Sequence, residues 1–438
     1  MSELFDKLNA TVKEDRLAAL KEIIASESAK PAFRDNDANN HIHTIYSFSP
    51  YSPTKAAFMA YSAGLTSAGI MDHDSLSGAE EFKAAAKILG LGATCGVEVR
   101  AKFKKGFGKI NHPDQADCIY MAAHGIPKQS IKPLNDYLAF YRKKRYERDE
   151  KMCELITEKY GKFGITLDFN KDVYPLSCAI EGGSITERHL LYALAIKLAN
   201  RFGRTDALLD FLADDLKLSV SEKIKGYLTD SENPHFLYDL LGVLKADTKF
   251  FYIDADEEMP DAYEFVSLAK SYGAIPAYAY LGDVGDSVTG DKKAQKFEDD
   301  FLPELMDELK KAGFLAVAYM PTRNTPAQLN RIMDFCREYG FFQISGEDIN
   351  SPRQKFACAA LAKPEYAHLI DSTWALIGHE AISSERGLDF GMFSDKSIKE
   401  TPDLYERIKK FAAIGKETVK KYRALYFNKI KKHKKGDL

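Results

Sequence analysis

The chain lacks the features of several protein classes. Its cysteines form no Cys-x-x-Cys pair, which excludes a zinc ribbon or a disulfide framework and predicts reduced, mostly buried thiols; they stand at positions 95, 118, 153, 178, 336 and 358. No apolar run reaches the roughly 18 residues that span a bilayer, and the charged start Met1–Lys7 has no signal-peptide core. A net charge of −3 gives no general electrostatic case for nucleic acid or membrane binding. We therefore expect a cytoplasmic protein.

The length and pattern of the chain predict an α/β barrel. Its 438 residues are 45% hydrophobic and 29% charged, as in ordinary soluble proteins, and are enough for two or three domains or one large barrel with insertions. After an amphipathic helix at 2–28, with Pro31 past its end, strands alternate with helices. The predicted strands end near His41 and otherwise cover 69–74, 94–101, 117–125, 250–254, 273–282, 315–319 and 341–346. About seven alternating strands favour a mainly parallel, closed or distorted barrel.

Two parts of the chain interrupt this alternation with helices. Helical stretches near 135–160, 186–202, 205–215, 220–227 and 235–246 predict an insertion, and 352–438 predicts a helical extension with a Lys-rich end, Lys429–Lys435. The expected division is an N-terminal helix (1–30), a first barrel part (31–133), the insertion (134–248), a second barrel part (249–351) and the extension (352–438).

The histidine pair in His41-Ile-His43-Thr is the first candidate for a metal site. Side chains alternate across a strand, so two histidines two positions apart point the same way. Each neutral imidazole offers one nitrogen to a metal. The pair by itself is equally compatible with two hydrogen-bonded histidines in a strand.

Further polar residues recur where predicted strands end. They are Asp72, His73, Asp74, Glu98, His124 and Asp348. In a barrel of parallel strands these ends lie on one face, so the side chains can meet there. His and carboxylate ligands without thiolate suit zinc, manganese or iron, and Glu98 is a candidate for bridging two ions. Singly, Glu98 is also compatible with a strand-end charge, and Asp72 or Asp74 with a helix cap.

As an ordered set, these motifs resemble the PHP (polymerase and histidinol phosphatase) superfamily of metal-dependent phosphoesterases. The motifs are His41-Ile-His-Thr, Gly69-Ile-Met-Asp-His-Asp-Ser-Leu-Ser-Gly78, Gly96-Val-Glu-Val and Ser345-Gly-Glu-Asp-Ile-Asn350, and the resemblance covers roughly residues 35–135 and 250–352. It implies a distorted (β/α)7 barrel with up to three divalent ions at its mouth. The implied metal ligands are His41, His43, His73, Glu98, His124 and Asp348.

The sequence departs from the family pattern at three places. Tyr280, in Ile275-Pro-Ala-Tyr-Ala-Tyr280, and Asn350 stand where the family has metal-binding histidines, and Phe48 stands near its early aspartate. A phenol and an amide are poor ligands for these ions. We therefore expect one or two bound ions, Tyr280 as a hydrogen-bond donor to a phosphate oxygen, and Asn350 as a substrate contact.

The resemblance also suggests residues that bind substrate. In family members with such an insertion, an Arg-His stretch opens a helix near the site, and Ile185-Thr-Glu-Arg-His189 is similar, so Arg188 and His189 are candidates. Arg323, just past a strand, is a candidate for bidentate contact with phosphate, and Arg100 shares the side of the strand that carries Glu98. Each arginine is equally compatible with a salt bridge, and Arg188 and His189 with a solvated helix face. The run Arg142–Arg145 and the Lys-rich end are interpreted as solvated helix faces, and the histidines at 112, 235, 368, 379 and 433 receive no role.

The resulting prediction is an enzyme that hydrolyses a phosphate monoester or diester with metal-activated water. His73 is expected to bind metal or to protonate the leaving oxygen. The expected partner is a phosphorylated small molecule, with a nucleotide as one candidate and nucleic acid less favoured. The alternative is a degenerate protein of the same fold that binds a phosphorylated ligand without turnover. A third idea, a nuclease, would use the basic helix.

Overall fold

The computed structural model describes residues 2–26, 34–112, 115–283 and 297–436, without side-chain detail at residues 2, 35 and 36 and from residue 425 onward. Two short helices open it, α1 (Ser2–Lys7) and α2 (Lys13–Ala25). The single helix expected at 2–28 is therefore wrong. The chain turns between them at Asn9. The Asn9 side-chain amide donates a hydrogen bond to the Pro50 carbonyl and accepts one from the Ser52 backbone N–H. Residues 27 and 28 and Pro31 lie outside the described residues.

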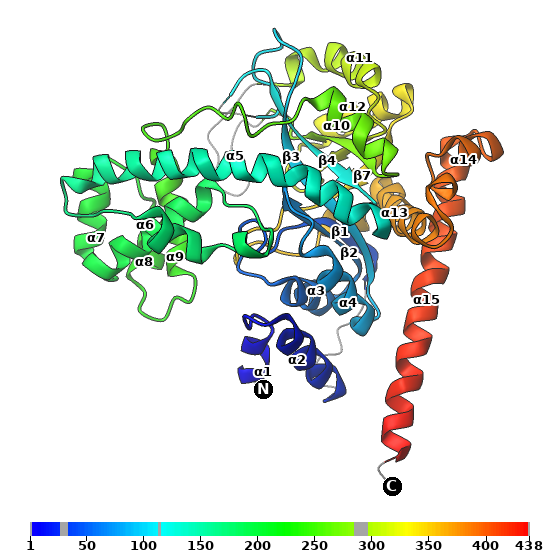
Figure 1. Cartoon of the computed structure of the whole chain (residues 1–438), viewed down its shortest axis with the longest axis horizontal. Helices are drawn as coiled ribbons and strands as arrows, with labels where there is room; N and C mark the ends of the chain where they lie inside the picture. The colour runs from blue at the N-terminus through cyan, green and yellow to red at the C-terminus, as the bar shows by residue number, and fades with distance from the viewer. Residues whose placement is uncertain (1, 27–33, 113–114, 284–296, 437–438) are drawn as a thin grey trace.

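The centre of the molecule is a mixed, nearly closed barrel of seven strands (Figure 1). The strands follow one another around the sheet in chain order: β1 (Arg34–Ile42), β2 (Leu65–His73), β3 (Gly92–Lys102), β4 (Cys118–His124), β5 (Ile275–Tyr280), β6 (Ala316–Tyr319) and β7 (Phe342–Ser345). The gap between β7 and β1 is narrowed by two backbone hydrogen bonds, His43 N–H to the Ile349 carbonyl at 2.9 Å and Ile349 N–H to the His41 carbonyl at 3.1 Å.

The expectation of parallel strand ends fails at β4, which runs antiparallel to both β3 and β5. Residues 103–117 between β3 and β4 contain no helix among those described. A connection of this kind returns the chain antiparallel, whereas a parallel neighbour needs a crossover, usually helical. His124 therefore ends a strand that points to the opposite end of the barrel from β3.

Helices cover the outside of the barrel and bury its outer face. They are α3 (Pro53–Ser62), α4 (Ala79–Leu89), α10 (Ala262–Ser271), α11 (Leu302–Ala312) and α12 (Pro326–Tyr339). Local signals place them: Ser52 caps α3 with Pro53 at its first position, and Thr325 with Gln328 forms a capping box for α12. The strand expected at 250–254 is wrong. Phe251 packs into the core of the insertion, and the Ile253 carbonyl accepts a hydrogen bond from Arg148 instead of pairing in the sheet.

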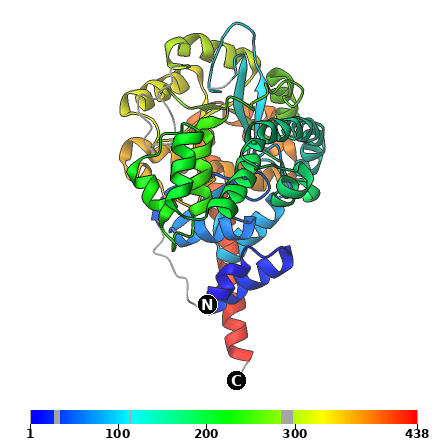
Figure 2. The ribbon, with the colours of Figure 1, turned by 90° about the vertical axis from the view of Figure 1, so that its left-hand side faces the viewer.

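The insertion forms a helical layer beside the barrel mouth, on the left in Figure 1 and facing the viewer in Figure 2. Its helices are α5 (Lys128–Gly161), α6 (Glu187–Phe202), α7 (Asp206–Asp210), α8 (Glu222–Thr229) and α9 (Phe236–Leu244), and they share a hydrophobic core of their own. The expected boundary at 134 falls inside α5. Arg142 and Arg145 are not on a solvated face: Arg145 is 3% exposed, and both bond to Asp74 of the barrel.

The C-terminal helices pack against the far end of the barrel. Helix α13 (Ala367–Arg386) contacts β1, β3 and β7, and α15 (Leu404–Gly436) packs along it, with the short α14 (Asp395–Glu400) between them. The outer part of α15 extends away from the rest of the molecule in Figure 1. The side chains of Lys429–Lys435 lie outside those described. Within the described residues, no helix combines the length and apolar character needed to cross a bilayer.

Candidate metal centre

Four of the predicted ligands form a tight cluster at the barrel mouth. The Nε2 atoms of His41 and His43 are 3.2 Å apart and lie 3.5 and 3.7 Å from Glu98 Oε2. Asp348 Oδ1 is 3.2 Å from His43 Nε2. Ligand atoms arranged tetrahedrally at about 2.0–2.1 Å from zinc would be about 3.3 Å apart. The donor types and their spacing therefore suit a divalent ion, and His41, His43 and Asp348 form one group whose ligand atoms lie within 4.8 Å of one another.

His73 extends the cluster along β2. Its Nδ1 lies 3.0 Å from Glu98 Oε2, because His73 pairs with Glu98 in the parallel register of β2 and β3. His43, His73 and Glu98 thus form a second group with ligand atoms within 4.8 Å of one another. His43 belongs to both groups, and Glu98 Oε2 lies within 3.7 Å of His41, His43 and His73, a position that suits a bridging carboxylate.

Asp348 reaches the cluster because Gly346 lets two segments approach closely. A Cβ at position 346 would lie 2.7 Å from the His41 Cβ, nearer than real Cβ contacts come. Only glycine therefore allows the segment after β7 to lie against the end of β1. This contact brings the first and last strands of the barrel together at the site.

A buried hydrogen-bond chain orients His43. Ser47 Oγ donates to Asp72 at 2.7 Å and lies 3.2 Å from His43 Nδ1. Because the Ser47 proton is committed to Asp72, the Ser47 oxygen is free to accept from His43 Nδ1–H. This tautomer leaves the Nε2 lone pair facing Glu98 and Asp348, as metal ligation requires. Thr44 donates to Asp72 through both its backbone N–H and its hydroxyl, at 2.6 Å each.

The charges in the cluster favour a cation. Burial would raise the pKa of Glu98, but the charges of His41 and His73 hold it well below its ordinary value. Burial likewise opposes the low pKa of Asp348, which His43 and His41 sustain. Burial tends to lower the pKa of His41, yet the charge of Glu98 outweighs it, and the pKa is raised. Burial, and then the charge of His73, lower the pKa of His43. Two carboxylates thus remain ionised among the histidines, which suits a bound cation.

His124 faces the same site from the antiparallel strand β4. It lies two positions beyond Ala122, which pairs with Glu98, so it shares the inner face of the barrel. Its side chain is 1% exposed, and neither ring nitrogen has a hydrogen-bond partner among the described residues. Burial lowers the pKa of His124 to about 3, which keeps the ring neutral. A buried imidazole without partners beside Glu98 is chemically suited to a metal.

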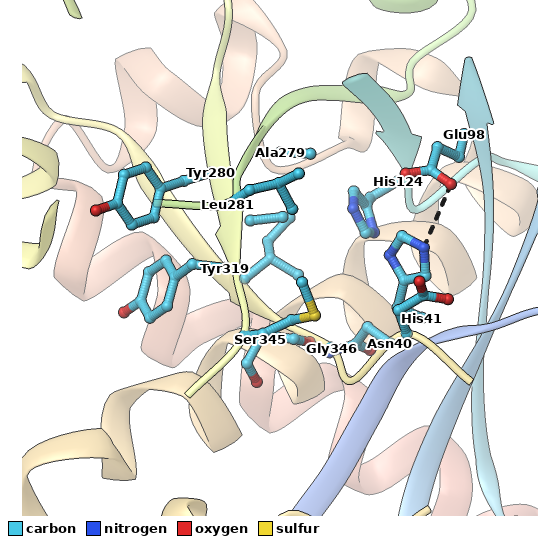
Figure 3. A pocket seen from close by; sticks show the side chains of 14 residues that line it. Asn40, His41, Glu98, His124, Ala279, Tyr280, Leu281, Tyr319, Ser345 and Gly346 are labelled. Atoms are coloured by element: carbon cyan, nitrogen blue, oxygen red, sulfur yellow. Dashed lines mark hydrogen bonds and ion pairs between the residues drawn. The ribbon is translucent and has the colours of Figure 1, made fainter. Parts of the chain in front are cut away.

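A pocket of about 450 Å³, including its open mouth, lies between these ligands and strands β5 and β6. Figure 3 shows His41, Glu98 and His124 on one side of it and Leu281 facing them from the other. Ala279, Leu281, Ala318 and Met320 give that second side an apolar surface.

Tyr280 does not occupy the place predicted for it. Its hydroxyl points away from the metal cluster in Figure 3 and donates to Asp299 Oδ1 at 2.6 Å. Alternation along β5 places Ala279 and Leu281, the neighbours of Tyr280, toward the pocket. Aligning motifs by position missed this, because a shift of one residue moves a side chain to the other face of a strand. In this orientation Tyr280 cannot donate a hydrogen bond to a phosphate bound at the cluster.

Three other predicted positions have defined contacts. The Asn350 amide donates to Asp348 Oδ1 at 2.5 Å, so it supports a ligand. Arg323 Nε donates to the Leu281 carbonyl at 3.0 Å, at the edge of the pocket. Phe48 is 6% exposed and packs edge-on to the His189 ring at 5.0 Å, which places it in the core of the insertion.

The Arg188–His189 pair lies at the start of α6. His189 Nδ1 accepts the Thr186 backbone N–H at 3.0 Å and so completes a helix cap, a structural use that leaves only its other nitrogen for a ligand. Arg188 is near enough to Asp348 for its charge to help lower the pKa of that carboxyl. Its Nη1 atom is buried and has no hydrogen-bond partner among the described residues.

Some residues of the site carried no recognised signal in the sequence. Ser47 and Thr44 follow the histidine pair closely, so their spacing from His43 was a usable hint.

Other candidates have structural partners instead. Asp72 accepts hydrogen bonds from Thr44 and Ser47, and Asp74 pairs with Arg145 at 2.8 Å. Arg100, a candidate phosphate contact, is 5% exposed and pairs with Glu187 and Glu258.

Solved structures that are similar to this chain include one described as a candidate metal-dependent phosphoesterase. A candidate metal-dependent phosphoesterase from Bifidobacterium adolescentis shares 18% identity with this chain and superposes with a TM-score of 0.51, over 77% of this chain and 96% of its own. An amidohydrolase from Chromobacterium violaceum, with bound sulfate and no metal, shares 16% identity at a TM-score of 0.48, over 76% of this chain and 96% of its own. No family model and no curated protein sequence matches. The first similarity establishes a shared barrel fold.

Proposed function

We propose that this protein is a metal-dependent hydrolase of the PHP type that cleaves a phosphate ester, either a monoester or a diester. The observation that carries the proposal is the cluster of His41, His43, His73, Glu98 and Asp348, whose donor atoms form two groups with the spacing of metal ligands. The phosphoesterase description of the Bifidobacterium structure supports the choice of reaction.

The residues present are suited to one or two ions. His41, His43, Glu98 and Asp348 would hold the first, and Glu98 with His124 would contribute to a second. We expect no third ion of the full family cluster, because Phe48 packs against His189 and the Asn350 amide donates to Asp348. A bound divalent ion such as zinc, manganese or iron supplies Lewis acidity that activates water and stabilises negative charge on a phosphoryl group.

The protein groups around the ions have separate tasks. Arg188 offers to a phosphate oxygen its Nη1 atom, which has no hydrogen-bond partner among the described residues. His73, in contact with Glu98, is placed to hold metal or to protonate the leaving oxygen. Arg323 lies at the pocket edge, where it can meet the rest of the substrate. These tasks suit a phosphorylated small molecule, for example a nucleotide, bound at the mouth of the barrel in the cytoplasm.

Metal analysis combined with turnover tests this proposal. The purified protein should contain zinc, manganese or iron and should hydrolyse an aryl phosphate when manganese is added. His43→Ala should abolish both metal retention and turnover. His235→Ala is the matched control, because His235 is a partly exposed histidine before α9 whose side chain caps nothing. Unchanged turnover in His43→Ala would refute the assignment.

A second candidate is a protein that binds a phosphorylated ligand without hydrolysing it. The apolar surface of Ala279 and Leu281, on the strand where the family has a ligand histidine, favours this alternative. It predicts retained metal and measurable phosphate binding with no release of phosphate from any ester. Turnover that is lost in His43→Ala would exclude it.

A further inference from the structure

An ion-pair frame joins the insertion to the two strands that carry His73 and Glu98. It contains three arginines and three carboxylates: Arg100, Arg145, Arg148, Asp74, Glu187 and Glu258. Arg100 Nη1 lies 3.1 Å from Glu187 Oε1, and Arg148 Nε lies 2.5 Å from Glu258 Oε2. Arg148 also pairs with Glu187, and Arg100 with Glu258. The three arginines are 3–7% exposed, so these pairs are shielded from solvent.

Glu187 is the member of this frame that belongs to α6. It is held from two sides, by Arg100 of β3 and by Arg148 of α5. Arg100 stands two positions after Glu98 on the same strand, so the start of α6 is tied to the strand that supplies a predicted metal ligand. Burial would raise the pKa of Glu187, but the charges of Arg100 and Arg148 hold it well below its ordinary value. Glu187 therefore stays ionised and paired.

These contacts fix the helix turn from which Arg188 extends. Thr186 and His189 close the cap on either side of it, and Glu187 is anchored directly before it. Arg188 itself has a buried Nη1 atom with no hydrogen-bond partner among the described residues, and it lies within electrostatic range of Asp348. Holding a backbone this firmly around a guanidinium whose Nη1 atom has no hydrogen-bond partner among the described residues resembles the preorganisation of a binding group.

We infer that Glu187 is a positioning residue, which through its ion pairs with Arg100 and Arg148 sets Arg188 to bind a phosphate oxygen at the metal cluster. The inference rests on the proposed function for the role of Arg188. It assigns to the insertion a defined task in the site. The barrel strand that supplies Glu98 also determines, through Arg100, where the phosphate-binding arginine stands.

The sign of one substitution separates positioning from plain electrostatics. Glu187→Gln removes a negative charge close to an anion site, and by charge alone it would strengthen phosphate binding. If Glu187 acts by holding Arg188, the same change weakens binding. Loss of one charge-assisted contact corresponds to about tenfold in affinity.

The experiment measures binding of inorganic phosphate to the full-length protein by calorimetry, with and without added manganese. We expect Glu187→Gln to weaken binding about tenfold, and Arg188→Gln to weaken it at least as much. The double variant should bind no more weakly than Arg188→Gln alone, because Glu187 acts through Arg188. Asp247→Asn is the control: it removes another ion pair of α5, with Lys159 at 2.5 Å, and should leave phosphate binding unchanged.

Several results would overturn the inference. They are unchanged or tighter phosphate binding in Glu187→Gln, an equal loss from Glu187→Gln in the Arg188→Gln background, and no phosphate binding by the unaltered protein. If Glu187→Gln does not fold, Glu187→Asp decides, since it keeps the charge but withdraws it by one methylene, and unchanged binding there refutes the inference. Metal content and aryl phosphate turnover are measured in parallel. Absence of both would refute the proposed function, while the phosphate measurement still judges Glu187.

Discussion

Replacing Ser47 with alanine tests whether the chain behind His43 prepares the metal centre. Ser47 is fully buried, and its hydroxyl lies between His43 Nδ1 at 3.2 Å and Asp72 at 2.7 Å. Ser47→Ala leaves a buried imidazole N–H without its acceptor, while Asp72 keeps both hydrogen bonds from Thr44. An unsatisfied buried donor costs about 1–3 kcal/mol. Outer contacts of this kind typically change metal affinity about 10–100-fold, or about 1.4–2.8 kcal/mol.

Competition against a chromophoric chelator would measure this effect for zinc and manganese. Ser49→Ala is a matched control two positions away, because the Ser49 hydroxyl is also buried but has no hydrogen-bond partner among the described residues. We expect Ser47→Ala to weaken metal binding about 10–100-fold and Ser49→Ala to leave it unchanged. Equal affinities in the two variants would refute the argument that Ser47 selects the tautomer of His43.

Three further predictions concern stability. Saturation with manganese at a hundred times its dissociation constant should stabilise the fold by about 2.7 kcal/mol, and a chelator should reverse the rise in thermal midpoint; a midpoint indifferent to metal contradicts the site. Burial raises the pKa of Glu298 to about 8, so the folded state holds its proton more tightly than the unfolded state, and this group lowers stability as pH rises from about 4.5 to about 8. Glu298→Gln should therefore gain stability relative to the native protein between pH 5 and pH 8 in urea titrations, and a parallel pH dependence would count against this. Arg16→Met breaks a buried pair with Glu81 and should cost about 3–5 kcal/mol of unfolding free energy; a loss below 1 kcal/mol would mean that Glu81 finds other compensation.

The sequence alone determined most of the strand–helix alternation and the set of ligand types. Strands β2, β3, β5, β6 and β7 lie near their predicted positions, because each contains a short apolar run between helical segments. The polar β1 was located only by the His41–His43 pair at its end. His41 and His43 share a face by the period of a strand, which is a local property. The motifs around Glu98 and Asp348 named the residues that the fold brings to that pair.

The direction of a strand, the side to which a residue points and the pairing of a segment were decided by the tertiary structure. The direction of β4 depends on the connection before it, so His124 approaches the site from the opposite sense to the one expected. Tyr280 was assigned by motif position, yet the pleat of β5 turns it outward to Asp299. The strand expected at 250–254 does not form, because Phe250 and Phe251 pack into the hydrophobic core of the insertion, a long-range contact that no local pattern contains.

The arginines of α5 show the same division most clearly. As sequence, Arg142–Arg145 is a charged run on a long helix, and a solvated face is the ordinary interpretation. In the fold, Asp74 and Glu258, far from it along the chain, supply the partners that make burial of Arg145 acceptable. Local spacing determines which side chains share a face of one element. Whether a charge is buried, paired or free to meet a substrate depends on neighbours from other elements, and only the tertiary structure decides that.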